Sequence, residues 1–180
     1  MLKKISVLLL AFGVVLAPNG ANASSHAKSL QNLDMNEIMF AQMMIPHHAQ
    51  AISMSETALK KSRNQEILKL SRQIKSLQSS EISQLAYWLK ATNSSMTMDH
   101  DMKMSGMLSV KELASLKRLT GTQFDRTFLQ LMIKHHQGAL EMIDLISDSR
   151  NMEAKALAKA INSAQSKEIT SMKLLLNKLK

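Results

Sequence analysis

The sequence predicts an all-α protein, an antiparallel four-helix bundle of the ferritin-like kind built from two repeated helical hairpins. Three observations predict this fold class. Apolar residues recur at spacings of three and four, the two halves of the chain repeat each other, and Gly, Pro and β-branched alternation are too sparse for a sheet, with five Gly and two Pro in 180 residues. A chain of this length suits a single domain.

The first residues are expected to be an export signal and not part of the fold. Lys3 and Lys4 precede an apolar stretch over 5–17, and small residues end at Ala23. The stretch is shorter than the ~20 residues that a membrane-spanning helix needs. We therefore expect a signal peptide over 1–23, an N-terminal tail over 24–33 and a bundle domain over 34–180, in an exported, periplasmic and soluble protein without stable membrane insertion.

The bundle domain consists of two copies of one unit. The run from Met44 to His48 matches the run from Met132 to His136 at an offset of 88, and after one dropped residue the match resumes at Arg63 and Arg150. This pattern predicts repeat one over 34–90, a connection over 91–122 and repeat two over 123–180.

Each repeat is expected to form two helices joined by a turn of two or three residues, which forces an antiparallel hairpin. Three good helix-start signals occur: the pair Asp34 and Glu37, then Asn64, and then Asn151. The pair Thr122 and Asp125 is a weaker signal. The expected helices cover 34–61, 64–90, 123–148 and 151–178.

The long connection is expected to hold a short helix of its own. Ser109 and Glu112 form a capping box that opens a helix over 109–120, and Gly121 can end it in a left-handed cap. A connection of this length can run along the whole bundle, as it does in ferritin-like folds.

Composition excludes several classes of function. The chain has no Cys, which removes disulfides, Cys-ligated zinc, iron–sulfur clusters and a thiol nucleophile. Its net charge of +9 falls to +7 without Lys3 and Lys4, but the basic residues are scattered and aromatic residues make up 3%. Nucleic-acid binding is therefore not expected.

The strongest chemical signal is the doubled Met-x-x-His-His run. On a helix, Met44 reaches His47 and His48, and the second repeat places its Met and His pair in the same way. Thioethers and imidazoles together select Cu(I), and by the same softness Ag(I). The candidate metal ligands on the helices are Met39, Met43, Met44, His47, His48, Met54, Met132, His135, His136 and Met142.

An alternative explanation is that these methionines only fill gaps in a core with few aromatic residues, with the histidines as satisfied polar groups. The doubled His pair favours the metal site, because burying imidazoles carries a desolvation cost that packing does not explain.

The second signal lies in the long connection. There a thioether or an imidazole occupies every second position from 96 to 104, with one more Met shortly after, and no branched apolar residue lies between them. Such a segment can wrap a soft ion, although chance enrichment of Met in a loop is the alternative. The candidate ligands here are Met96, Met98, His100, Met102, Met104 and Met107.

A third signal depends on cleavage after Ala23. The new N-terminus would read Ser24-Ser25-His26, whose amine, two amides and imidazole form a square-planar set suited to Cu(II).

Other positions are expected to support the His pairs. Gln78 should lie level with His48, and Glu81 level with Met44, where they could accept the free ring N–H of an imidazole. Pro46 is expected to kink the first helix, and Gly138 would let another helix approach closely.

At 44–51 and 132–139 the chain resembles the bacterial family known as domain of unknown function 305, which repeats a Met-x-x-His-His-x-x-Ala element twice. The resemblance covers about 34–180 and implies a ferritin-like helical fold and an exported location. It also implies copper binding in copper tolerance, with the matched Met and His residues as ligands. The first copy departs from the family pattern at Ala49-Gln50, which weakens the case for two equal sites.

These observations favour a non-enzymatic periplasmic protein that binds Cu(I) or Ag(I) for sequestration or for delivery to a copper efflux or chaperone protein. One alternative is a b-type haem bundle with Met and His axial ligands. A metal-free helical interaction module is another. A di-iron enzyme is disfavoured because the chain has no Glu-x-x-His motif.

Overall fold

The computed structural model describes residues 33–98 and 104–179, and every regular element in these ranges is a helix. The all-α prediction is confirmed. The four long helices are α2 (Met35–Lys61), α3 (Gln65–Ala91), α5 (Gly121–Met142) and α7 (Met152–Lys178), and the two short ones are α4 (Val110–Arg118) and α6 (Asp144–Ser147). No helix within the described ranges is long and apolar enough to cross a membrane.

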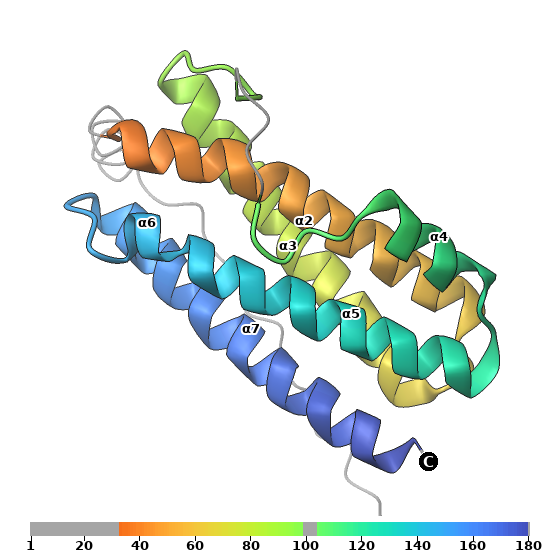
Figure 1. The fold of residues 1–180 in the computed structure, drawn as a ribbon. Helices are drawn as coiled ribbons and strands as arrows, with labels where there is room; N and C mark the ends of the chain where they lie inside the picture. Colours follow the sequence, from red (N-terminus) through yellow and green to blue (C-terminus); the bar gives the residue numbers. More distant parts are fainter. Residues whose placement is uncertain (1–32, 99–103, 180) are drawn as a thin grey trace, which may run out of the picture.

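The helices form two hairpins that lie against each other (Figure 1). Helix α3 packs on α2, α7 packs on α5, and α2 packs on α5 between the hairpins. Helices α2 and α7 run in one direction, and α3 and α5 run in the other. Helix α5 runs in the same direction as α3. This is possible because the connection returns along α2 and places α4 beside the start of α5.

Capping explains where most helices begin. Asp34 accepts hydrogen bonds from two backbone N–H groups while Glu37 closes the capping box, and Asn64 and Asn151 cap α3 and α7 in the same way. Ser109 and Glu112 form the expected box at α4. At α5 the expectation was wrong, because the N-cap is Thr120, without a side-chain hydrogen bond, and not Thr122.

The predicted helix over 123–148 is divided at Ile143 into α5 and α6. The N–H of Ile143 donates to Ala139 four residues back, whereas the N–H of Ile146 donates to Ile143 three residues back, so the ladder tightens there. The residue that the second repeat lacks falls in the same stretch, between the matched Met142 and Arg150.

Gly121 has a φ of +57°, as its left-handed role requires, but α4 already ends at Arg118, so this glycine opens α5 and does not close α4. Pro46 lies inside α2, which is not divided there. The predicted signal peptide and most of the tail lie outside the described residues.

Candidate metal centre

All four long helices contribute to one layer of buried polar side chains near their midpoints. We call this set the polar layer; it consists of His47, His48, Gln78, Glu81, His135, His136, Gln165 and Glu168. Seven of its members are buried and Glu81 is partly buried. Apolar residues lie on either side of it along each helix and form two separate clusters. The molecule therefore encloses a polar level between two halves of an apolar core.

The centre of the layer is the contact between His47 of α2 and His135 of α5. Their ring centroids lie 3.8 Å apart, and each ring lies beside the next histidine of its own helix at 6.4 or 6.3 Å. Burial and the neighbouring imidazole of His48 lower the pKa of His47 to about 3, and burial together with His47 lowers the pKa of His135 well below 6.5. Both rings are therefore neutral at pH 7, with a lone pair available to a cation.

The outer histidine of each pair faces a carboxylate from the second helix of its hairpin. His48 Nε2 lies 2.7 Å from Glu81 Oε2, and His136 Nε2 lies 2.8 Å from Glu168 Oε2. A carboxylate at Nε2 favours the tautomer with its proton there, which leaves the lone pair on Nδ1. In both rings Nδ1 is buried without a hydrogen-bond partner.

This arrangement corrects part of the prediction about which side chains support the histidines. The sequence placed Gln78 level with the His pair and Glu81 level with Met44, yet it is the Glu residues that reach the imidazoles. Both amide atoms of Gln78 and of Gln165 are buried without partners among the described residues. The helical register fixed the level of these side chains, but only the rotation of α3 and α7 decides which of them meets a ring.

Thioethers lie on both sides of the polar layer. Met44 and Met142 belong to the first apolar cluster, with Met43, whereas Met54 and Met132 belong to the second. All five are buried, and Met39 is partly buried against the first cluster. Because α2 and α5 are antiparallel, the methionines of the two Met-x-x-His-His runs lie on opposite sides of the layer. The sequence predicted the shared helical face but not this separation.

The connection crosses the layer directly. Its residues 104–108, the crossing segment, pass over the junction of α2 and α5, where the carbonyl of Ser105 accepts a hydrogen bond of 3.0 Å from His47 Nε2. A Cβ on Gly138 would lie 2.2 Å from the Ser105 carbonyl, and a Cβ on Gly106 would lie 2.7 Å from the carbonyl oxygen of His135. The sequence suggested that Gly138 lets another helix approach closely. In the structure Gly138 lies against the crossing segment instead.

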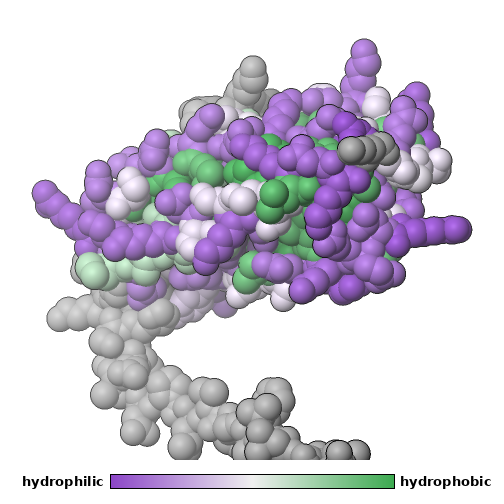
Figure 2. Space-filling view, turned by 90° about the horizontal axis from the view of Figure 1, so that it is seen from below, coloured by the Kyte–Doolittle hydropathy of each residue, from purple (hydrophilic) through white to green (hydrophobic). Residues whose placement is uncertain are grey.

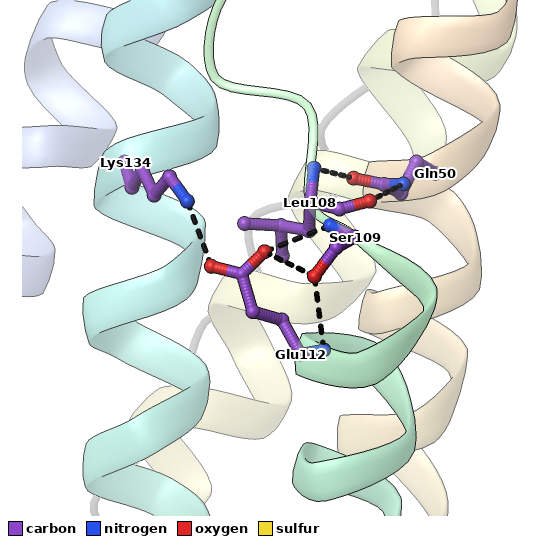
Figure 3. Close-up of polar contacts among 5 residues, drawn as sticks. All are labelled: Gln50, Leu108, Ser109, Glu112 and Lys134. Atoms are coloured by element: carbon purple, nitrogen blue, oxygen red, sulfur yellow. Dashed lines mark hydrogen bonds and ion pairs between the residues drawn. The ribbon is translucent and has the colours of Figure 1, made fainter.

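Polar contacts clamp the crossing segment at its end (Figure 3). The Gln50 amide donates to the Leu108 carbonyl at 3.0 Å and accepts from its N–H at 2.8 Å. Glu112, held by Ser109, pairs with Lys134 of α5 at 2.7 Å, and this lysine and Ser109 together lower the pKa of Glu112 to about 2. The segment is thus tied to both helices that carry the His pairs. No sequence pattern predicted the contact of the Ser105 carbonyl with His47.

The Met-rich connection is placed only in part. Met98 and Met104 pack against the first apolar cluster, Met107 is partly buried, and Met96 is exposed. The predicted ligands His100 and Met102, and His26 near the N-terminus, lie outside the described residues. Within the described ranges, no group of three or more His, Asp or Glu side chains is arranged to hold a metal by itself.

The chain is similar in sequence and fold to proteins of one known family. The family described as domain of unknown function (DUF305) matches residues 37–176. A DUF305 fragment from Deinococcus radiodurans is 32% identical, with a TM-score of 0.75 over 81% of this chain and 97% of its own. A DUF305 protein from Streptomyces coelicolor is 27% identical, with a TM-score of 0.77 over 80% and 93%.

CopM in its Cu(I)-bound form is also similar, with 31% identity and a TM-score of 0.67 over 79% of this chain and 96% of its own. CopM structures in Cu(II)-bound and Ag-bound forms match to a similar degree. No curated protein matches this chain significantly in sequence.

Proposed function

Because this chain belongs to the DUF305 family, and because its polar layer holds imidazole nitrogens that no protein group satisfies, we propose that it is a non-enzymatic Cu(I)-binding protein. It binds Ag(I) by the same chemistry. Its task is to sequester copper, or to deliver it to an efflux or chaperone protein, in the periplasm or another exported location. The scaffold is a ferritin-like four-helix bundle whose two hairpins each supply one Met-x-x-His-His run.

The observation that carries the proposal is the set of unpartnered ring nitrogens. Nδ1 of all four histidines, and Nε2 of His48 and of His135, are buried without a hydrogen bond. Buried polar groups in folded proteins are normally paired, and each unpaired one costs about 1–3 kcal/mol. A soft cation taking these lone pairs would remove that cost, and thioethers lie on both sides to complete its shell.

The chain's own groups prepare the donors. Hydrogen bonds from Nε2 of His47 to the Ser105 carbonyl and from Nε2 of His136 to Glu168 direct the lone pairs of these two rings to Nδ1. Glu81 lies 2.7 Å from Nε2 of His48 and favours the same tautomer there. The low pKa of His47 and His135 keeps protons from competing with the metal. The CopM structures with Cu(I), Cu(II) and Ag support this ligand class. The methionines of the connection, of which Met96 is exposed, would serve as the first point of capture, and His26 would hold Cu(II) at a processed N-terminus.

The test is a titration with Cu(I) under a reducing atmosphere against a chromogenic chelator. We expect tight binding that is strongly reduced when His47, His48, His135 and His136 become Ala. Replacing Met44 and Met132 by Leu should weaken binding further, whereas the matched change at the exposed Met35 and Met152 should not. Failure to compete with the chelator would overturn the proposal, and a Soret band in the purified protein would indicate haem instead.

A further inference from the structure

The positive charge of the protein is concentrated on two helices. Helices α3 and α7 together carry nine Lys and Arg and four Glu, a formal net charge of +5, whereas all the described residues together carry +6. Two of the four carboxylates, Glu81 and Glu168, face imidazoles inside the molecule. The outer surface of these helices is therefore more basic than the formal sum, while the rest of the described molecule is close to neutral.

Apolar side chains are exposed on the same two helices. Leu77 of α3 and Leu174 of α7 are 40% and 59% exposed. Helices α3 and α7 are not closely packed, and the groove between them is lined by Leu70, Leu174 and Leu175 together with Lys69 and Lys178. Glu66 also lines this groove and pairs with Lys178 at 3.2 Å, which leaves Lys69, among the described residues, as its unpaired lysine. In the space-filling view from below, apolar surface is framed by hydrophilic side chains (Figure 2). This face combines leucines with flanking lysines, whose long stems can cover apolar surface while the ammonium groups stay in water.

We infer that the α3/α7 face docks on an anionic lipid bilayer. Lysines at the rim would meet acidic headgroups while the exposed leucines enter the boundary between headgroups and acyl chains. A second copy of this chain fits poorly, because two such faces would bring net charges of +5 together. The inference does not depend on copper binding, since the polar layer faces the interior of the molecule.

The test is co-sedimentation of the metal-free protein, after export and with its N-terminus established by mass spectrometry, with vesicles. We expect binding to vesicles with 30% phosphatidylglycerol in phosphatidylcholine, little binding to phosphatidylcholine alone, and loss of binding in high salt. Lys69 lines the groove, and the exposed Lys167 lies on α7 two helical turns before Leu174. The double variant Lys69→Glu and Lys167→Glu should bind at least about 25-fold more weakly, because each lysine near an anionic surface contributes about fivefold. Leu77→Ser with Leu174→Ser should weaken binding at unchanged charge.

The matched control reverses two exposed charges on α4, with Lys117→Glu and Arg118→Glu, and should retain most of the binding. Circular dichroism of each variant checks that the helices remain folded. Equal loss in the α4 control, equal binding to both kinds of vesicle, or no binding at low salt would each overturn the inference. Capture of soluble polyglutamate without vesicle binding would also overturn it and assign the face to an acidic protein.

Discussion

Replacing His135 by leucine is expected to make the metal-free protein more stable. The ring is buried, and neither of its nitrogens has a hydrogen-bond partner. Since an unpaired buried polar group costs about 1–3 kcal/mol, the two nitrogens together lower the free energy of unfolding by about 2–6 kcal/mol. Leucine carries no polar atom and fills a similar space.

Part of this gain is offset by contacts that the ring makes. Its centroid lies 3.8 Å from that of His47, and an aromatic pair of this kind contributes about 0.5–1.5 kcal/mol. Imperfect packing of the branched side chain costs about 1 kcal/mol more. Subtracting these two costs, about 2 kcal/mol together, from the midpoint of about 4 kcal/mol leaves a stabilisation of about 2 kcal/mol in the absence of metal.

The measurement is urea unfolding of both proteins in the presence of a chelator, with an unchanged slope required for the comparison. The adjacent His136→Leu is the matched control. It leaves the buried carboxylate of Glu168 without its partner at 2.8 Å, so we expect a destabilisation of about 3–5 kcal/mol.

The two outcomes separate a ligand site from an ordinary core. If His135→Leu lowers the free energy of unfolding by about 2 kcal/mol or more, as a change in a well-packed core does, the argument from unpaired nitrogens is refuted. The stabilised variant should also bind Cu(I) more weakly, so that stability and metal affinity change in opposite directions.

Three further predictions use the same metal-free protein. Because the pKa values of His47 and His135 are lowered in the folded state, their contribution to the free energy of unfolding is fully present above pH 6.5 and is lost as the pH falls toward 3, by up to ~1.4 kcal/mol per pH unit for each ring. Urea unfolding at several pH values measures this loss. A double variant with leucine at both positions that kept the full pH dependence would contradict the prediction. Gly138→Ala places a Cβ 2.2 Å from Ser105 and should lower the free energy of unfolding by about 2 kcal/mol or more, with faster proteolysis near the crossing segment. The control Gly121→Ala, in open space at φ +57°, should lower it by about 1 kcal/mol, as measured by thermal unfolding. Similar losses in the two variants would argue against the close contact. Gln50→Ala removes both hydrogen bonds to Leu108 and should cost about 1–3 kcal/mol, with faster amide exchange at Leu108, so unchanged exchange would show that the clamp is not needed.

Local chemistry made most of the secondary structure predictable from the sequence. Asp34, Asn64, Asn151 and Ser109 cap helices where the sequence placed the starts, because a cap needs only the next three residues. The break at Ile143 was missed because a long helical period continues through it and no Gly or Pro marks it. The repeat did contain a signal, since the second copy lacks one residue in that stretch.

The burial of both His pairs at the centre follows from the sequence alone, because the period of a helix and the doubled Met-x-x-His-His run place them on core-facing stripes. How these residues meet depends on the packing of the helices. The antiparallel crossing of α2 and α5 brings His47 against His135 and sends the two leading methionines to opposite sides of the layer. The pairing of His136 with Glu168, and the contact of Ser105 with His47, depend on helix rotation and on the path of a connection. Those quantities arise from packing between distant segments, for which the local pattern of a sequence carries no signal.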